Sequence, residues 1–270
     1  MIERFFIYLT ELSPKLKRGL WRWWYQFLAK SYQKPDVQFM NYGFSDLNSE
    51  LGSIHLKEKD EPYRYCIQLY HYVATATEVK GKQVLEVGSG RGGGAAYIAG
   101  YLEPESMIGV DFAERNAQLS RQIHQLPNLS FQQGDAEALP FADNTFELVV
   151  NVESSHCYGS MKQFVQEVSR VLKPGGIFSW ADLRPLDQVE NLKKTFAESG
   201  LQEVKSAEIT PNVLEALASL DQPKQNFIQT YVPSFLQHSL QEFTAVKDSQ
   251  MYQGFQTGQM VYLSYVFRKE

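Results

Sequence analysis

A glycine-rich turn is the stretch of this chain best suited to hold a nucleotide-like ligand. Gly88, Gly90 and Gly92 recur at every second position within residues 88–94. Because glycine has no Cβ, the backbone can turn tightly there and a ligand can approach it closely. The apolar run 83–87 predicts a buried strand before the turn, and a helix that offers free N–H groups is expected after it. This order predicts the nucleotide-binding start of a doubly wound α/β sheet.

A histidine and an aspartate form a second feature with chemical potential. His156 follows the apolar run 146–152, and Asp182 ends the run 176–182. Strands four and five are neighbours in a doubly wound sheet, so both side chains should reach its ligand-binding edge. A histidine oriented by a carboxylate is the usual general base. We therefore predict His156 as the base and Asp182 as its partner. The alternatives are a packed or ligand-contacting imidazole, and Glu153 as either the partner carboxylate or a cofactor contact.

Seven apolar runs and the segments between them predict the elements that position these residues. The expected strands are 83–87, 106–111, 129–134, 146–152, 176–182, 202–209 and 259–268, and the expected helices between them are 92–102, 113–125, 160–172 and 186–199. This alternation predicts an α/β fold with a doubly wound, mostly parallel seven-stranded sheet and right-handed crossovers.

Two further helical regions are expected outside this alternation. Stretches 211–219 and 225–241 predict a helical insertion before the last strand, at about 210–242, that walls a pocket. We expect residues 1–80 to form an N-terminal helical arm and substrate lid, which includes a helix at 61–79, and residues 81–270 to form the ligand-binding domain.

The first 34 residues differ from the rest of the chain in charge. They carry seven Lys/Arg against two Glu, a net of +5, which leaves −10 for the remainder of a chain whose net charge is −5. Ser13 and Pro14 predict a helix start, and the apolar, tryptophan-rich residues that follow predict a helix to about residue 32. Two interpretations stay open for this arm: a lid over the substrate pocket, or a helix lying on an anionic membrane surface.

Composition excludes several classes of protein. Of the 270 residues, 43% are hydrophobic and 21% charged, as in ordinary globular proteins, and the net charge of −5 argues against nucleic-acid binding. Two cysteines and scattered histidines predict neither a disulfide framework nor a metal site. No run reaches the roughly 18 apolar residues of a membrane span. We expect a cytoplasmic protein, with membrane association through residues 1–34 as the alternative; the oligomeric state is not readable.

The glycine pattern alone fits two families. It satisfies G-x-G-x-x-G of dinucleotide-binding proteins and, with Glu86, the E-x-G-x-G-x-G pattern of S-adenosylmethionine (SAM) methyltransferases; Asp111 at the end of the second strand suits both. The run Gly134-Asp135-Ala136-Glu137-Ala138-Leu139-Pro140-Phe141 resembles the adenine loop of the methyltransferases, and Leu172-Lys173-Pro174-Gly175-Gly176 resembles the turn before their fifth strand. The chain therefore resembles a class I SAM methyltransferase with a Rossmann-like sheet.

This resemblance assigns cofactor contacts. Gly88, Gly90 and Gly92 should line the methionine and ribose portion of SAM, Glu86 should reach its amino group through water, and Asp111 should bind the ribose hydroxyls. Asp135 and the Ala136 amide should bind adenine, and Asn151 is a further cofactor contact. No metal is expected.

Seven further motifs resemble a narrower family. They are Trp21-Arg22-Trp23-Trp24-Tyr25, Val37-Gln38-Phe39-Met40-Asn41-Tyr42, Asp60-Glu61-Pro62-Tyr63-Arg64, Leu69-Tyr70-His71, Gly92-Gly93-Gly94-Ala95, Asn151-Val152-Glu153-Ser154-Ser155-His156-Cys157-Tyr158 and Ala181-Asp182-Leu183-Arg184-Pro185. Together they resemble the phthiotriol/phenolphthiotriol dimycocerosate methyltransferases and related fatty-acid O-methyltransferases. The resemblance implies methyl transfer from SAM to an oxygen of a hydrophobic lipid or polyketide-like acceptor. The candidate acceptor contacts are Trp24, Tyr42, Tyr70, His71, Tyr158 and Tyr231.

The acceptor atom decides what His156 must do. An aliphatic alcohol is about as weak an acid as water, with a pKa of ~15.7, so it needs a base, whereas a carboxylic acid is already ionised near neutral pH. We predict methylation of a hydroxyl with His156 as general base. The alternatives are a fatty-acid carboxyl O-methyltransferase, a catalytically silent SAM- or lipid-binding protein and, more distantly, a nicotinamide oxidoreductase.

Overall fold

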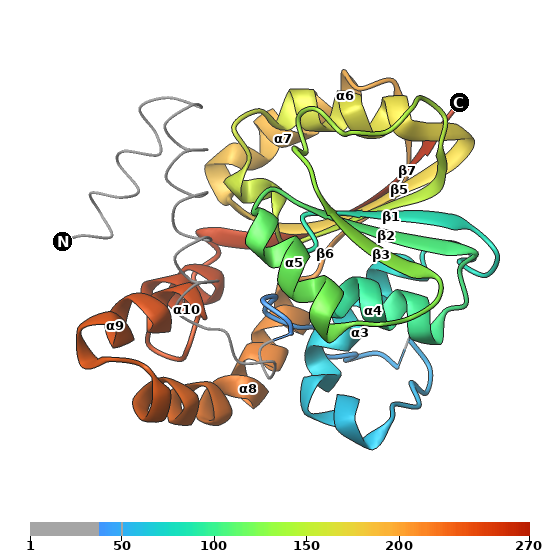
Figure 1. The fold of residues 1–270 in the computed structure, drawn as a ribbon. Coiled ribbons are helices and arrows are strands. Elements are labelled where there is room, and N and C mark those ends of the chain that lie inside the picture. Colours follow the sequence, from blue (N-terminus) through green and yellow to red (C-terminus); the bar gives the residue numbers. More distant parts are fainter. Residues whose placement is uncertain (1–37, 50) are drawn as a thin grey trace.

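The computed structural model describes residues 38–49 and 51–270, and the predicted arm helix, with Trp24, lies outside the described residues. A seven-stranded sheet runs through the molecule in the order β3-β2-β1-β4-β5-β7-β6 (Figure 1). The strands are β1 (Gln83–Val87), β2 (Ser106–Asp111), β3 (Leu129–Gln133), β4 (Phe146–Val152), β5 (Leu172–Pro185), β6 (Leu201–Glu208) and β7 (Met260–Lys269). β7 is antiparallel to both neighbours, and the other pairs are parallel. The expected fold class is confirmed.

Helices cover both faces of the sheet. They are α3 (Arg64–Ala74), α4 (Gly93–Tyr101), α5 (Glu114–Ile123), α6 (Met161–Val171), α7 (Val189–Ala197), α8 (Thr210–Tyr231), α9 (Ser234–Phe243) and α10 (Gln250–Gln256), with short 3-10 turns η1 (Glu58–Tyr63), η2 (Ser155–Cys157) and η3 (Leu186–Gln188). Helices α6 and α7 lie on one face, and α3, α4 and α8 on the other (Figure 1).

The central strands are apolar on both sides because both faces are covered. All residues of β4 except Glu147 are buried, as expected for a parallel strand between two helical layers. One hydrophobic cluster joins the sheet to α3, α4, α8 and α10, and a second joins it to α6 and α7. The core therefore holds the strands rigidly and leaves their carboxyl ends to carry polar groups.

The insertion before β7 differs from its expected form. A single helix, α8, replaces the expected helix 211–219, continues through Pro223 and takes in the first part of the expected helix 225–241, whose remainder is α9. Helix α10 was not expected. Proline removes one helical hydrogen bond, but Val213 and Leu217 before it and Ile228 after it are all buried, so packing retains the helix. The break between α8 and α9 falls at Val232, which has an extended backbone because Pro233 follows it.

Two other elements also differ in length from their predictions. The expected helix 61–79 is divided into η1, which contains Pro62, and α3, which ends at Ala74. The Thr75 hydroxyl donates to the His71 carbonyl at 2.6 Å and helps to satisfy this helix end. β5 is longer than expected at both ends, because residues 172–175 and 183–185 also join the strand.

The strand order brings distant segments to one crevice. β1 pairs with β2 on one side and with β4 on the other, so the chain reverses its winding direction between β1 and β4. In open α/β sheets, ligands bind at the carboxyl ends of the strands beside such a switch. Because β7 runs antiparallel, its beginning, with Tyr262 opposite Leu183, lies at the same edge.

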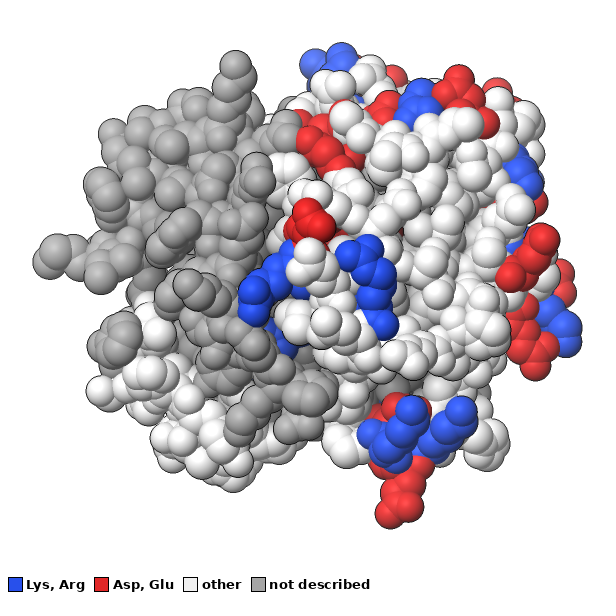
Figure 2. All heavy atoms as spheres, viewed as in Figure 1, with Lys and Arg blue, Asp and Glu red and all other residues white. Residues whose placement is uncertain are grey.

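One face of the molecule shows how its described charges are distributed. On the described part of the face in Figure 2, acidic and basic side chains are interspersed rather than gathered by sign. Within the described residues, no helix has the length and apolar character needed to cross a bilayer.

Candidate active site

The glycine turn adopts backbone angles that side chains disfavour. Gly88, Gly90 and Gly92 have φ values of 79°, 53° and 79°, all in the left-handed region. Gly92 caps the N-terminus of α4, and the Gly90 N–H donates to Asp111 Oδ2 at 2.9 Å. The spacing of the glycines is therefore a requirement of the backbone, and the turn is tied to the end of β2.

Asp111 connects the glycine turn to the next helix. Its Oδ1 accepts from the Ala113 N–H at 2.9 Å and from Asn116 Nδ2 at 3.1 Å. Burial raises the pKa of Asp111 to about 6, although these hydrogen bonds and the one from Gly90 lower it. A carboxylate offers about four acceptor positions, so roughly one stays open for a ligand hydroxyl.

Glu86 lies under the turn as a fully buried carboxylate. The Tyr70 hydroxyl donates to its Oε1 at 2.7 Å, and burial raises the pKa of Glu86 to about 7. A Cβ added at Gly94 would lie 1.9 Å from the Tyr70 ring, so this glycine gives the ring its space. Tyr70, predicted as an acceptor contact, therefore supports the cofactor side through Glu86.

The turn after β4 packs against the first glycine. Asn151 Nδ2 donates to the Val87 carbonyl at 2.8 Å and lies 2.8 Å from Ser154 Oγ and 3.1 Å from the Tyr158 hydroxyl. A Cβ at Gly88 would lie 2.3 Å from Ser154 Oγ. Tyr158, also predicted as an acceptor contact, thus stands beside the glycine turn.

Buried polar atoms without partners gather around this turn. Five buried side-chain polar atoms of the described residues lack a hydrogen bond, and three of them are Glu86 Oε2, Ser89 Oγ and Asn151 Oδ1. Buried polar groups are nearly always satisfied, so this concentration indicates a polar ligand or bound water. The residues present fit the amino, carboxyl and ribose groups of SAM.

The loop after β3 is tied to the turn after β4. Asp135 Oδ1 accepts from the Glu137 N–H at 3.0 Å, and Ala136 is buried. Glu137 Oε1 accepts from the Gly159 and Ser160 N–H groups at 2.8 and 3.2 Å. Adenine binding by Asp135 and Ala136 stays a prediction.

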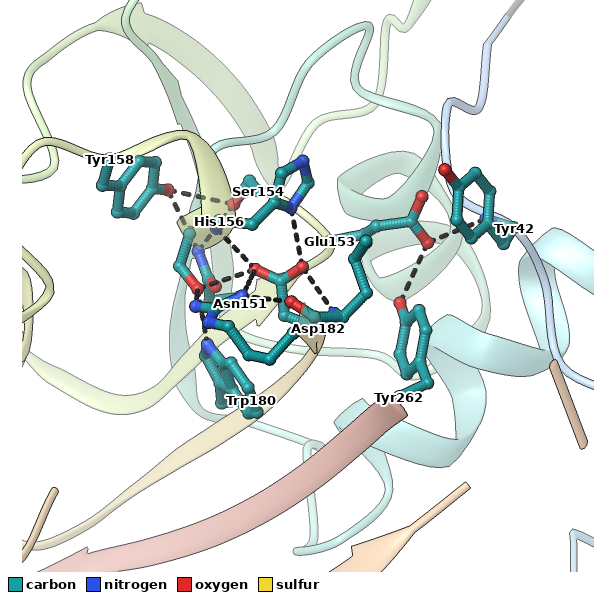
Figure 3. Close-up of polar contacts among 12 residues, drawn as sticks. Tyr42, Asn151, Glu153, Ser154, His156, Tyr158, Trp180, Asp182 and Tyr262 are labelled. Atoms are coloured by element: carbon teal, nitrogen blue, oxygen red, sulfur yellow. Dashed lines mark hydrogen bonds and ion pairs between the residues drawn. The ribbon is translucent and has the colours of Figure 1, made fainter. Parts of the chain in front are cut away.

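His156 and Asp182 meet as the sequence predicted. His156 Nδ1 lies 2.7 Å from Asp182 Oδ1, and the His156 backbone N–H donates to Oδ2 at 2.9 Å (Figure 3). His156 stands on η2 after β4, and Asp182 lies near the end of β5. The carboxylate is fully buried, whereas the imidazole is 22% exposed. This contact fixes the ring and leaves Nε2 on its far side.

The carboxylate also has partners that sequence reasoning missed. The Ser155 hydroxyl donates to Asp182 Oδ2 at 2.7 Å, and Arg184 Nη1 forms an ion pair with it at 3.1 Å. Trp180 Nε1 and Arg184 Nη2 both donate to Ser155 Oγ, at 2.9 and 2.7 Å. Alternation along β5 places Asp182 and Arg184 on one side of the strand, which was the available signal.

Charge around the pair sets its protonation. Burial works against a charged imidazolium, but Cys157 and the Asp182 carboxylate outweigh it and raise the pKa of His156 to about 10. Although burial works in the opposite direction, His156 and Arg184 hold the pKa of Asp182 well below its usual range. At neutral pH the pair is an imidazolium beside a carboxylate.

Glu153 is a second carboxylate of the site and lies on the turn after β4, as His156 does. Its Oε2 accepts from the Tyr42 backbone N–H at 2.8 Å and from the Tyr262 hydroxyl at 2.9 Å (Figure 3). It has a φ of 47°, a region that costs a non-glycine residue about 1–2 kcal/mol. Burial raises the pKa of Glu153 to about 8, although the Tyr42 hydrogen bond and the His156 charge lower it. The partner of His156 is thus Asp182, and Tyr262 joins the site unpredicted.

Of the remaining predicted acceptor contacts, His71 and Tyr231 lie apart from this cluster, whereas Tyr42 belongs to it. His71 Nδ1 lies 2.6 Å from the Tyr97 hydroxyl, between α3 and α4. Tyr231, on α8, is 53% exposed and packs against Phe227 at 5.3 Å between ring centroids. Tyr42 is buried, and its backbone N–H binds Glu153 as described above.

Comparison with known proteins gives matches over most of the chain. Residues 85–180 match a family model described as a methyltransferase domain. The chain is 38% identical over 258 residues to the phthiotriol/phenolphthiotriol dimycocerosates methyltransferase of Mycobacterium leprae, which covers 96% of this chain and 95% of that protein. It is 37% identical over 219 residues to the fatty-acid O-methyltransferase of Mycolicibacterium smegmatis, with 81% and 79% covered.

A solved structure supports the fold assignment. The geranyl diphosphate C-methyltransferase of Streptomyces coelicolor A3(2), in complex with S-adenosyl-L-homocysteine, matches with a TM-score of 0.65 at 15% identity, over 91% of this chain and 98% of that chain. At this identity the likeness establishes the fold alone, so the acceptor must be argued from the site.

Proposed function

The chain belongs to the phthiotriol/phenolphthiotriol dimycocerosates methyltransferase family and is a SAM-dependent methyltransferase, and we propose that it methylates a hydroxyl oxygen of a hydrophobic acceptor. SAM supplies an electrophilic methyl group when bound. We propose that the glycine turn 88–92, Glu86, Asp111 and Asn151 hold it at the crevice beside β1, with Asp135 and Ala136 at its adenine. The three unsatisfied polar atoms around the turn support this placement.

The 2.7 Å contact between His156 Nδ1 and Asp182 Oδ1 carries the proposal of a hydroxyl acceptor. The contact orients the imidazole, and we propose that its Nε2 takes the acceptor proton. A positioned base of this kind contributes typically 10²–10⁴-fold to the rate. The neighbouring carboxylate then stabilises the imidazolium that forms. An alcohol, with its pKa of ~15.7, needs such a base.

The raised pKa of His156, about 10, makes the base strong but scarce. At pH 7 roughly one molecule in a thousand has the neutral imidazole when the pKa is near 10. Turnover should therefore rise with pH above neutrality and level off near pH 10.

The same charge favours a second candidate, methyl ester formation on a fatty acid. A charged His156 would attract a carboxylate, and one relative is named a fatty-acid O-methyltransferase. In that case the imidazolium binds and orients an acceptor that is already ionised. Binding should then weaken as pH rises through about 10 and His156 loses its charge.

The variant His156→Ala separates these two functions. The substrates are a long-chain alcohol and a fatty acid of equal chain length in the same mixed micelles, with the demethylated cofactor product as readout. For the hydroxyl reaction, we expect kcat to fall about 10²–10⁴-fold with little change in SAM affinity. For the carboxyl reaction, KM should rise while kcat is nearly kept.

Controls for this experiment come from the same chain. His55 is exposed, and His55→Ala should retain wild-type kinetics. A near-normal kcat for His156→Ala on the alcohol, with a flat wild-type profile from pH 7 to 10, would contradict the base. Methylation of the fatty acid alone would replace the hydroxyl by the carboxyl function.

We further propose three acceptor contacts and a role for residues 1–34. The relatives' names support a hydrophobic acceptor, and Trp24, Tyr42 and Tyr231 stay proposed contacts to it. The basic residues 1–34 are proposed to cover the pocket or to attach a cytoplasmic enzyme to an anionic membrane. Co-sedimentation with anionic and neutral liposomes separates these roles. Binding to neither, with lost turnover on deleting residues 1–34, supports the lid.

A further inference from the structure

The two oxygens of the Glu153 carboxylate have different surroundings. Oε2 accepts from the Tyr42 N–H and the Tyr262 hydroxyl, and no described residue donates a hydrogen bond to Oε1. In Figure 3 this second oxygen carries no dashed line, and both it and His156 Nε2 point towards the top of the view. A carboxylate oxygen and the predicted base thus face one region.

Both donors to Oε2 belong to well-packed residues. Tyr262 is fully buried on β7, and Tyr42 is buried with its hydroxyl 3.2 Å from the Phe243 carbonyl. The Glu153 N–H itself donates to the Ala181 carbonyl at 2.8 Å. With one oxygen held by two fixed donors, the carboxylate has little freedom to rotate, and Oε1 keeps one direction.

Several ionisable groups face this carboxylate from the elements packed around it. His156 and Asp182 stand beside it at the ends of β4 and β5, and Cys66, Tyr70 and Lys224 interact with it electrostatically from α3 and α8. Lys224 also donates to the Thr244 carbonyl at 3.0 Å. These groups leave Oε1 as a hydrogen-bond acceptor in a partly dehydrated setting.

We propose that Glu153 Oε1 accepts a hydrogen bond from a hydroxyl of the methyl acceptor, and that this makes Glu153 the residue that selects alcohols over carboxylates. The inference rests on the proposed function. Above about pH 8, where Glu153 is ionised, its carboxylate accepts from an O–H donor and opposes a second carboxylate, which has no hydrogen to donate and carries the same charge. His156 alone would not reject a carboxylate, because its imidazolium attracts one.

The variant Glu153→Gln tests this selection with almost no change of shape. The Tyr42 and Tyr262 donors require an oxygen at the Oε2 position, so the amide NH₂ must take the place of Oε1. The group that faces the acceptor changes from an acceptor of hydrogen bonds to a donor. We expect KM for the long-chain alcohol to rise about tenfold or more, and the fatty acid of equal length to become a better substrate.

A pH dependence gives a second readout that a purely structural role would not move. Because burial raises the pKa of Glu153 to about 8, protonation below that pH places a hydrogen on the oxygen facing the acceptor. In the wild type, KM for the alcohol should rise as pH falls through about 8, and in Glu153→Gln this dependence should be lost. The His156 effect is read separately in kcat.

A matched control lies on β4, the strand that ends immediately before Glu153. Glu147, at the other end of β4, also accepts from one backbone N–H and one side chain, those of Gln83 and Lys173. Glu147→Gln should leave the preference for alcohol over acid unchanged. If Glu153→Gln does not fold, Tyr262→Phe removes one donor from Oε2 and should move the pH midpoint of the alcohol KM upwards.

The outcomes separate this inference from the proposed function. If the wild type methylates the alcohol and Glu153→Gln keeps the same alcohol-to-acid ratio of kcat/KM, the role of Glu153 is overturned while the function stands. If the wild type methylates the acid alone, the function itself fails, and the inference fails with it. A shift of the ratio towards the acid, with unchanged SAM affinity, supports both.

Discussion

The cofactor side of the site is built from residues that are near in sequence, whereas the acceptor side joins segments more than a hundred residues apart. Gly90 and Asp111 are separated by 21 residues, and Tyr70 and Glu86 by 16. Glu153, in contrast, is held by Tyr42 from 111 residues away and by Tyr262 from 109. The cofactor side depends on local strand–turn–helix units. The acceptor side depends on which distant segments pack together at the edge of the sheet.

The two sides also differ in charge. On the cofactor side, burial raises the pKa values of Asp111 and Glu86 to about 6 and 7, and no described cation pairs with either carboxylate. On the acceptor side, His156 and Arg184 compensate Asp182 directly. A bound cation such as a sulfonium or ammonium would offset charge on the cofactor side, whereas the acceptor side is already internally balanced. A substitution on one side should therefore impair the function of that side and leave the function of the other side intact.

The largest expected effect comes from Asp182→Asn on the acceptor side. The substitution removes the charge that stabilises the imidazolium, so kcat at alkaline pH should fall by about 10²-fold or more. Loss of this carboxylate also lowers the pKa of His156, and the pH profile should therefore move towards acid. Arg184, itself buried, would be left without its ion pair, and the free energy of unfolding should fall by about 3 kcal/mol.

Asp221→Asn provides the comparison for this variant. Asp221 is also buried and accepts from the Lys247 N–H at 2.7 Å, but it lies on α8. The Asp221→Asn variant should be less stable than the wild type but should keep the wild-type pH profile of kcat. SAM affinity, measured by calorimetry, should stay near wild type in both variants. An unchanged pH profile in Asp182→Asn would remove the coupling between Asp182 and His156.

A smaller effect is expected from Asp111→Ala on the cofactor side. Hydrogen bonds to a charged group contribute about 1.5–3 kcal/mol each, so the dissociation constant of SAM should rise at least about tenfold. Part of this loss comes from the released Gly90 N–H. Asp111→Asn keeps the size of the side chain and should lose less. Unchanged SAM affinity in Asp111→Ala, measured by calorimetry, would rule out Asp111 as a ribose contact.

The smallest effect is expected from Tyr70→Phe, which tests the hydroxyl that α3 contributes to Glu86. The change leaves Glu86 without its hydroxyl donor in a fully buried place, so its pKa should rise further. Leaving a buried group unsatisfied costs about 1–3 kcal/mol of unfolding free energy. SAM affinity should change only a few-fold and fall most at low pH, where Glu86 is protonated. A large loss of acceptor turnover with intact SAM binding would show instead that Tyr70 acts on the acceptor side.

The free energy of unfolding should depend on pH, because the pKa values of several buried groups are raised in the native state. The unfolded chain loses its protons from Glu86, Glu153 and His156 at lower pH than the native chain, whose pKa values are about 7, 8 and 10. Because the native state then binds more protons, stability falls as pH rises from about 5 to 10. The cofactor-free protein should therefore unfold more readily at the alkaline pH at which the base is most active.

Local patterns in the sequence were sufficient for the cofactor side and for much of the sheet. β1, β2 and β4 begin and end at the predicted residues, because an apolar run between glycines or polar residues marks a strand buried on both faces. The glycines of the turn were identifiable because their φ values exclude most other residues. The His156–Asp182 contact was also predictable, because strand order alone brings those two strand ends together.

The partners of Glu153, the path of α8 through Pro223 and the charge of His156 depend on tertiary packing. Tyr262 reaches the site because β7 enters the sheet antiparallel beside β5, and Tyr42 reaches it because residues 38–44 pack against α3 and the turn after β4. No short-range pattern encodes such contacts, since they depend on which buried surfaces fit together. Protonation follows the same rule: residue type sets the ordinary pKa, and burial with the charges of Asp182 and Arg184 sets the actual one.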